Sequence, residues 1–251
     1  MNAVEFTGQN PRRETRFGVL IPSTNSILER DAHVFLPHNV SAHFSRMRYD
    51  PSGAEPLVEM RRHAEQAASL LADSEMDVVA YGCTAGSLLT GLSYDVELAR
   101  ALYGITGVST ITTASSVIDA LRASGASRVS VVTPYSDQVD RMLIAYLEEQ
   151  DIKVVSIGGF DGIEPREIPL IQPEAIVQAV LETEYDASEA IFLSCTAMRG
   201  MECIETVRNA TGKPVVTSNQ ATFRKMFLET GDAQLERYVQ DSGIFSIPTK
   251  G

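Results

Sequence analysis

A repeat of two short motifs at one separation constrains this fold more than any other sequence feature. Cys83 follows Pro22 by 61 residues, and Cys195 follows Pro134 by the same distance. Each residue of the second pair lies 112 positions after its counterpart in the first. The letters around the motifs agree as well, with GCTA at the first cysteine and SCTA at the second. Two matches at one offset, each at the end of an apolar run, predict a duplicated structural unit.

Short β-branched runs alternate with longer amphipathic stretches along the chain. The apolar runs predict strands over 16–22, 76–83, 128–134, 153–157, 189–195 and 214–218, and more weakly over 40–47. The amphipathic stretches predict helices over 55–72, 137–149, 173–184 and 201–211. Strands that alternate with helices form parallel βαβ units, and continuously apolar strands lie in a sheet covered on both faces. The fold class expected from this pattern is α/β.

The repeat and the alternation together predict two similar Rossmann-like lobes with parallel sheets, related by a pseudo-twofold axis. The first lobe spans 16–113 and the second spans 114–217. Residues 218–251 are expected to form helices that complete the first lobe. Because ligands bind beyond the carboxyl ends of parallel strands, the active site is predicted in the cleft between the lobes.

The net charge and the apolar runs indicate which kinds of partner this chain can bind. Among 251 residues, 33 are acidic and 21 are basic, which gives a net charge of −12. Such a chain repels nucleic acid and anionic membranes unless basic residues cluster, and no long basic cluster is found. No apolar run reaches the roughly 18 residues of a membrane helix, and the first 16 residues are polar, unlike a signal peptide. We expect a cytoplasmic protein that acts on a small molecule, without nucleic acid or membrane as a partner.

The repeated cysteines are the residues best placed for chemistry. Cys83 and Cys195 each follow a predicted strand, so the two thiols are expected to face one cleft from opposite sides. Backbone N–H groups after each cysteine would favour an anion and lower the pKa of the thiols. Two such thiols can move a proton from one face of a carbon to the other. Alternatively, one can attack while the other donates a proton.

Cysteines can also be inert packing residues or metal ligands. An isolated buried cysteine is usually an inert apolar residue, and Cys203, which has no counterpart in the first copy, is assigned that role. The spacing of Cys195 and Cys203 does not suit a metal, and all histidines lie in the first quarter of the chain. No glycine motif for a nucleotide is found, so we expect neither a metal nor a cofactor.

Three polar residues follow predicted strands. Asn25 and Asn219 occupy positions where asparagine often caps a helix. Tyr135 occupies a position where a tyrosine is often partly buried, with its hydroxyl group in a hydrogen bond. Asn219 is interpreted as a cap.

As a set, these segments resemble the aspartate/glutamate racemase superfamily, and within it the branch that contains maleate cis–trans isomerase, arylmalonate decarboxylase and racemase-like proteins of ectoine-utilisation clusters. The resemblance extends from about residue 16 to 230. The motifs that carry it are IPSTN at 21–25, YGCTAGS at 81–87, VTPY at 132–135, SCTAMR at 194–199 and GKPVVTSNQ at 212–220. The resemblance implies two α/β lobes, no cofactor, and self-association as a homodimer or homotetramer.

The resemblance also implies roles for particular residues. Cys83 and Cys195 would be the catalytic pair, with Cys83 attacking a double bond and Cys195 donating a proton in a maleate isomerase-like reaction. A racemase would use the two thiols as reciprocal base and acid. The substrate carboxylates would be held by the side chains of Asn25 and Tyr135 and by the backbone amides and hydroxyls of Thr84, Ala85, Thr196 and Ala197.

The leading hypothesis is therefore a cofactor-independent two-cysteine isomerase of a small (di)carboxylic acid, maleate cis–trans isomerase-like or amino-acid racemase-like. One alternative is an arylmalonate decarboxylase-like lyase that uses Cys195 alone. Arylmalonate decarboxylase has glycine at the first cysteine position, so the presence of Cys83 argues against simple decarboxylation. The other alternative is a non-catalytic carboxylate-binding protein, which needs no thiols. Residues 91–104 and 158–162 are candidates for a segment that closes over the site.

Overall fold

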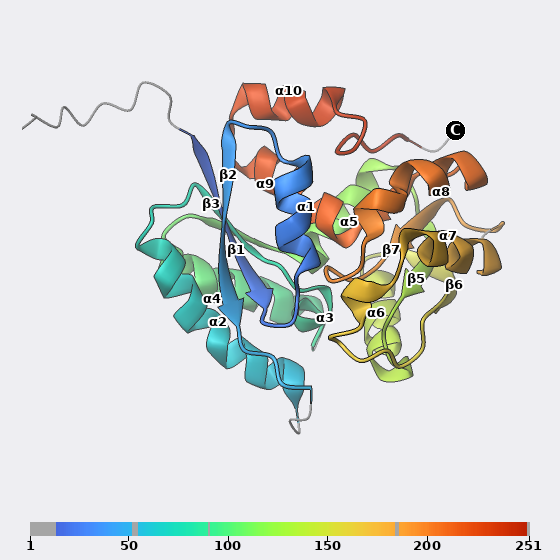
Figure 1. Cartoon of the computed structure of the whole chain (residues 1–251), viewed down its shortest axis with the longest axis horizontal. Helices are drawn as coiled ribbons and strands as arrows, with labels where there is room; N and C mark the ends of the chain where they lie inside the picture. Colours follow the sequence, from blue (N-terminus) through green and yellow to red (C-terminus); the bar gives the residue numbers. More distant parts are fainter. Residues whose placement is uncertain (1–13, 52–54, 90, 184–185, 250–251) are drawn as a thin grey trace, which may run out of the picture.

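The computed structural model describes residues 14–51, 55–89, 91–183 and 186–249. They form two four-stranded parallel sheets with the same strand arrangement, β2-β1-β3-β4 and β6-β5-β7-β8 (Figure 1). The strands of the first sheet are β1 (Thr15–Pro22), β2 (Val40–Met47), β3 (Val78–Tyr81) and β4 (Ser109–Thr112). Those of the second are β5 (Arg128–Thr133), β6 (Lys153–Gly159), β7 (Ala190–Leu193) and β8 (Val215–Thr217). The predicted α/β class with two similar parallel sheets is confirmed.

The sequence repeat has a direct counterpart in strand register. In the first sheet Phe17 of β1 pairs with Val78 of β3, and in the second Val129 of β5 pairs with Ala190 of β7. Each residue of the second pair lies 112 positions after its counterpart in the first. Strand β4 was not predicted, because three of the four residues in its short segment STIT are polar and the segment carries little apolar signal.

The helices have the following bounds in chain order. They are α1 (Ile27–Phe35), α2 (Pro56–Ala72), α3 (Thr84–Ser87), α4 (Leu92–Thr106), α5 (Thr113–Ala123), α6 (Asp137–Glu149), α7 (Pro173–Glu182), α8 (Ile204–Thr211), α9 (Ser218–Glu229) and α10 (Ala233–Asp241). Two short 3₁₀ helices, η1 (Ile168–Leu170) and η2 (Gly200–Cys203), complete the set. Residues 91–104, considered above as a mobile segment, lie mostly in α4, which buries Leu98 and Leu102 against the first sheet.

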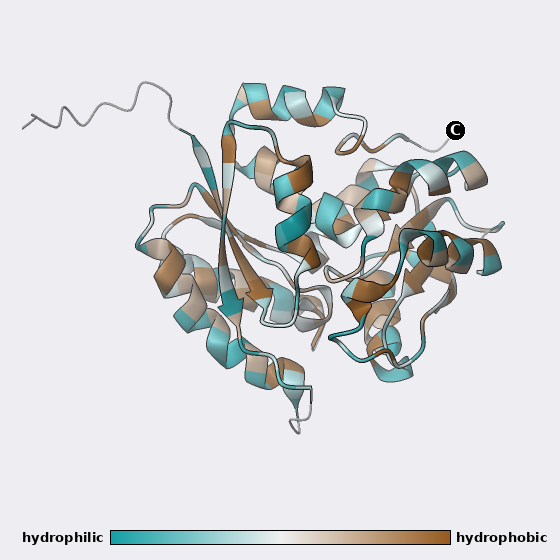
Figure 2. Cartoon of the chain, viewed as in Figure 1, coloured by the Kyte–Doolittle hydropathy of each residue, from teal (hydrophilic) through white to brown (hydrophobic). Residues whose placement is uncertain are grey.

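Helices cover both faces of each sheet, which explains the continuous apolar runs of the central strands. On one face of the first sheet, Leu20 and Val79 pack with α2 and α4. On the other face, Phe17 and Val19 pack with α1, α9 and α10. Figure 2 shows the helices as mixtures of hydrophilic and hydrophobic residues, as expected for amphipathic helices on a sheet. No helix formed by the described residues combines the length and apolar character that crossing a membrane requires.

An aromatic cluster attaches the C-terminal helices to the first sheet. The ring of Phe227 in α9 makes edge-to-face contacts with Phe17, Tyr238 and Phe245, with centroids 5.3, 5.5 and 5.1 Å apart. Such pairs add to the stabilisation that the buried area provides. These contacts fix the position of α9, whose first turn reaches the centre of the molecule.

Candidate active site

A pocket of about 330 Å³ lies where the carboxyl ends of the central strands of both sheets meet. Its lining contains every residue that the sequence analysis selected for the site: Asn25, Cys83, Thr84, Ala85, Tyr135, Cys195, Thr196 and Ala197. These residues follow β1, β3, β5 and β7, so each sheet contributes two strand ends. The shared edge of parallel strands is therefore what brings distant segments of the chain together.

Cys83 stands at the N-terminal end of α3. Its backbone is extended, with φ −147° and ψ 111°, and the N–H of Gly86 donates to its Sγ over 3.3 Å. The side chain is 7% exposed. A Cβ at Gly86 would lie 2.7 Å from the hydroxyl of Tyr81 and 3.1 Å from Sγ of Cys83, so this turn accepts only glycine.

Cys195 occupies the equivalent place after β7 with a different backbone. Its φ of 122° lies in the region that non-glycine residues avoid, at a cost on the order of 1–3 kcal/mol. The N–H of Ala197 donates to Sγ over 3.4 Å, and the N–H of Cys195 itself donates to Oγ of Ser218 over 3.1 Å. The side chain is half-buried in the pocket wall.

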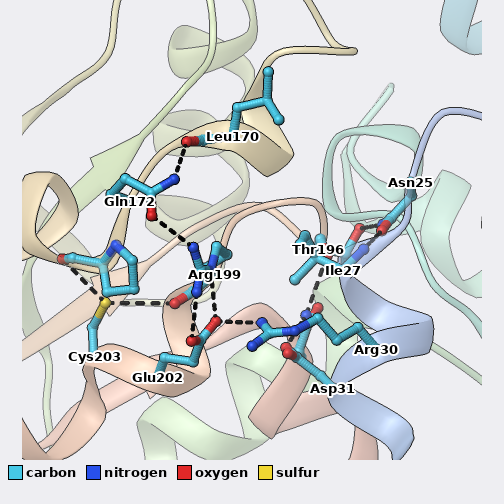
Figure 3. A network of polar contacts seen from close by, with 12 residues as sticks. Asn25, Ile27, Arg30, Asp31, Leu170, Gln172, Thr196, Arg199, Glu202 and Cys203 are labelled. Carbon is cyan, nitrogen blue, oxygen red and sulfur yellow. Dashed lines mark hydrogen bonds and ion pairs between the residues drawn. The ribbon is translucent and has the colours of Figure 1, made fainter.

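Thr196 ties the second cysteine loop to the first sheet. Its Oγ1 accepts from Nδ2 of Asn25 over 2.9 Å (Figure 3). The same oxygen donates to the carbonyl of Gly82 over 3.2 Å. Gly82 precedes Cys83 directly, so one hydroxyl links the two cysteine loops. Oδ1 of Asn25 accepts from the N–H groups of Ile27 and Leu28, which caps α1. Asn25 therefore caps a helix and lines the pocket at the same time.

Tyr135 presents a neutral hydroxyl to the pocket. Burial raises its pKa well above the usual value, and the neighbouring Cys195 adds to that rise. Oγ of Ser194 donates to the phenolic oxygen over 3.4 Å. A buried phenol that keeps its proton can donate a hydrogen bond to a carboxylate.

The expectation of lowered thiol pKa values was wrong. Burial raises the pKa of Cys83 to about 12, and burial likewise raises the pKa of Cys195. The N–H groups of Gly86 and Ala197 act in the opposite direction but do not offset the desolvation of the thiolates. At neutral pH both sulfurs are therefore predominantly thiols in this structure.

The interpretation of Asn219 as a helix cap was also wrong. Thr217 caps α9 instead, in a capping box with Gln220, because its hydroxyl lies one residue before the helix. Asn219 is inside the first turn, where its Nδ2 donates to Oδ2 of Asp31 over 2.7 Å and to the carbonyl of Thr196 over 3.2 Å.

Asp31 is a buried acid within α1, away from any motif, so no local pattern marks it as unusual. Its Oδ1 accepts no hydrogen bond from the described residues, and the same holds for Oδ1 of Asn219. Burial raises the pKa of Asp31 to about 7, against the effect of its bond from Asn219. A proton on the carboxyl is thus favoured up to near neutral pH.

An ion cluster joins α1 to η2 (Figure 3). The carboxylate of Glu202 accepts from Nε and Nη2 of Arg199, both over 2.8 Å, and also pairs with Arg30. These bonds, the one from Arg199 above all, hold the pKa of Glu202 at about 2. Cys203 lies outside the pocket, with its Sγ bonded to the carbonyls of Pro173 and Arg199, in keeping with a packing role.

Other pocket residues were not selected from the sequence. An apolar wall is formed by Tyr49, Leu57, Met60, Val139, Ile163 and Ile168. Among the described residues, no group of three or more His, Cys, Asp and Glu side chains is arranged to hold a metal ion. Apart from Leu57 and Met60, which share α2, the wall residues come from separate segments, and they share no motif, which is why sequence reasoning missed them.

Fold and pocket together define a class of protein: two similar α/β lobes with one cysteine from each at a shared cavity. A family model, that of arylmalonate decarboxylase, matches residues 40–242. The chain belongs to this arylmalonate decarboxylase and maleate isomerase family, within the Asp/Glu racemase superfamily, and the predicted resemblance is confirmed.

Individual relatives point to both branches of the family. The maleate isomerase of Alcaligenes faecalis is 26% identical over 242 residues, which cover 91% of this chain and 94% of that protein. The arylmalonate decarboxylase of Bordetella bronchiseptica is 25% identical over 217 residues, covering 82% and 86%. The structure of the maleate isomerase Iso from Pseudomonas putida S16 with maleate superposes with a TM-score of 0.79 at 26% identity, covering 85% of this chain and 90% of that one.

Proposed function

We propose that this chain is a cofactor-independent isomerase of a small carboxylic acid, with Cys83 and Cys195 as its catalytic pair. The observation that carries the proposal is the placement of two cysteines, one from each sheet, in the lining of a single pocket. A lyase of the decarboxylase type needs one thiol, and a binding protein needs none. The similarity to maleate isomerases favours the same conclusion.

The pocket offers donors for the substrate carboxylates. The neutral hydroxyl of Tyr135 and the remaining N–H of the Asn25 amide would bind one carboxylate. The N–H groups that follow each cysteine, at Thr84, Ala85, Thr196 and Ala197, would bind the rest of the acid. Backbone donors of this kind stabilise the enediolate that forms when charge moves from the reacting carbon to a carboxylate.

Either form of the reaction needs one thiolate and one thiol. In the maleate isomerase-like form, a thiolate at Cys195 takes the proton of Cys83 as Sγ of Cys83 adds to one alkene carbon. Cys195 then gives that proton to the other carbon. Rotation about the new single bond and return of the proton to Cys195 then release Cys83 from carbon and give the trans acid. Cys83 takes the proton back from Cys195 as it leaves, which restores the starting thiolate and thiol. In the racemase-like form, one thiolate removes the α-proton and the other thiol delivers a proton to the opposite face.

Proton NMR in deuterated water tests the proposal on a panel of maleate, aspartate, glutamate, a diaminobutyrate derivative and an arylmalonate. Conversion of maleate to deuterium-free fumarate would establish addition and elimination. Deuterium at the α-carbon of an amino acid would establish racemisation. Release of carbon dioxide from the arylmalonate that survives Cys83→Ser would instead favour the lyase, and binding without any exchange would favour a binding protein.

A further inference from the structure

The first turn of α9 reaches both cysteine loops through one buried side chain. Ser218, the first residue of α9, is fully buried. Its Oγ accepts a hydrogen bond from the backbone N–H of Cys195 over 3.1 Å and another from Oγ1 of Thr84 over 2.9 Å. Thr84 follows Cys83 directly, so this single oxygen is a common anchor for the two loops.

The anchor coincides with the strained residue of the site. Cys195 has a φ of 122°, and a non-glycine residue keeps such a conformation only where its surroundings determine it. In this conformation its N–H is directed to Ser218, while its Sγ accepts from the N–H of Ala197 over 3.4 Å. The contact with Ser218 is thus one of the restraints that hold the thiol in its place.

The next residue of α9, Asn219, also binds the loop that contains Cys195, but at a different atom. Asn219 holds the carbonyl of Thr196 and the carboxyl of Asp31. It touches neither cysteine, whereas Ser218 bonds to Cys195 itself. Ser218 is absent from the pocket lining and so acts on the site through the two loops.

We propose that Ser218 is a positioning residue that holds Cys195 in its left-handed backbone conformation and thereby sets the reactivity of that thiol. The effect on turnover rests on the proposed two-cysteine function. The effect on the thiol does not, because thiol reactivity can be measured without a substrate.

The test is the rate at which iodoacetamide alkylates each cysteine, followed by peptide mass spectrometry. Ser218→Ala removes the acceptor, so Cys195 relaxes and its sulfur moves from the N–H of Ala197. We expect Cys195 to be alkylated about tenfold more slowly than in the unmodified chain, because loss of a hydrogen bond to the thiolate lowers its population by about this factor. Cys203, buried outside the pocket, serves as the internal reference, because it is alkylated only when the fold opens.

Thr222→Val is the matched control on the next turn of α9. Oγ1 of Thr222 is also buried and bonds to the carbonyl of Ser218 and to Thr113, but to neither cysteine loop. Thr222→Val should leave the alkylation rate of Cys195 unchanged. Ser218→Thr keeps the hydroxyl and should therefore retain most of the rate that Ser218→Ala loses. An unchanged or faster rate in Ser218→Ala, or an equal fall in Thr222→Val, would overturn the proposal.

Amide exchange in the unmodified chain keeps the inference testable if Ser218→Ala does not fold. The amide hydrogen of Cys195 should exchange slowly by NMR, because Ser218 accepts it inside the protein. Exchange as fast as that of an exposed loop amide would contradict the bond. If Ser218→Ala slows alkylation of Cys195 but the unmodified chain shows no chemistry on the acid panel, the proposed function is refuted and the positioning role stands.

Discussion

The two cysteine loops are copies in sequence but differ in structure from the cysteine onward. At the residue before each cysteine the two copies agree. The N–H of Gly82 donates to the carbonyl of Leu20, and the N–H of Ser194, the equivalent residue of the second copy, donates to the carbonyl of Val132. At the cysteines the N–H of Cys83 turns to the carbonyl of Tyr81, whereas that of Cys195 turns to Ser218. The repeat therefore determines where each thiol leaves its sheet, and the tertiary partner determines how it is held.

The divergence gives the two sulfurs different surroundings. Burial raises the pKa of Cys83, and only one hydrogen bond, from the N–H of Gly86, acts to lower it. That of Cys195 is lowered by bonds from Ala197, Tyr135 and Met198, although burial still raises it overall. More donors around Cys195 favour it as the sulfur that carries charge before attack, which is the order of events in the proposed mechanism.

Removing either sulfur is expected to have the largest effect. Cys83→Ser and Cys195→Ser should each lower kcat/KM by about 10² to 10⁴-fold, since each removes a group that transfers a proton or forms a bond. The measurement is the rate on whichever acid shows turnover or exchange by NMR. Cys203→Ser is the matched control and should stay within about twofold, because a serine hydroxyl can keep the bonds to the carbonyls of Pro173 and Arg199. A loss in only one of the two site variants would show that the loops do not act as a pair.

The dependence of rate on pH is expected to be nearly as large. Because the pKa of Cys83 is about 12 and that of Cys195 is raised, the reactive thiolate is a minor species at neutral pH. The value of kcat/KM should rise about tenfold per pH unit between pH 7 and 8, in proportion to the thiolate, and should keep rising above pH 8. A profile that is already flat at pH 7 would contradict this account of the thiols.

A smaller effect concerns the acid behind the second loop. The folded state raises the pKa of Asp31 from its ordinary value of 3.8 to about 7, so it binds the proton more tightly than the unfolded chain does. The stability from this group is full below about pH 4 and is lost as the pH rises to about 7. The Tm of Asp31→Asn should therefore fall less steeply between about pH 4 and pH 7 than the Tm of the unmodified chain. An identical slope in both proteins would refute the assignment.

The smallest effect is expected at the ion cluster between α1 and η2. Glu202→Gln should lower the free energy of unfolding by about 1 kcal/mol at pH 7, the upper range for a partly exposed ion pair. Because the folded pKa of Glu202 is about 2, below the ordinary 4.5, this stability is present above pH 4.5 and is lost toward pH 2. Denaturant unfolding at pH 7 and pH 2 measures the difference, which should be much smaller at the lower pH.

Much of the fold and the site was predictable because it follows strand ends. The repeat predicted Cys83 and Cys195 at the ends of two strands, and they lie beyond β3 and β7. Asn25 and Tyr135 were predicted from their positions after apolar runs together with the family resemblance, and they lie beyond β1 and β5. The same logic could have selected Ser218, the residue directly after β8, since it stands in a quoted motif. Serine at a helix start is usually a cap, so the residue type alone does not indicate a bond to a cysteine loop.

Other features depend on tertiary contacts that no local pattern reveals. The backbone of Cys195 requires an acceptor from α9, and the sequence around it matches that of Cys83, which is extended. The rise in thiol pKa depends on how deeply the packed lobes bury the sulfurs, whereas the local N–H groups alone suggested a fall. Asp31 is visible as an unusual residue only after α1 is packed against α9.

The central claim is that two unlike loops present their sulfurs to one ligand, and alkylation with and without that ligand tests it most directly. The ligand is the acid that shows turnover or exchange by NMR, titrated against iodoacetamide labelling of all three cysteines. The account predicts that Cys83 and Cys195 become protected together, at one and the same half-protecting concentration, while labelling of Cys203 does not change. Protection of only one of the two, or protection at two different concentrations, would contradict it.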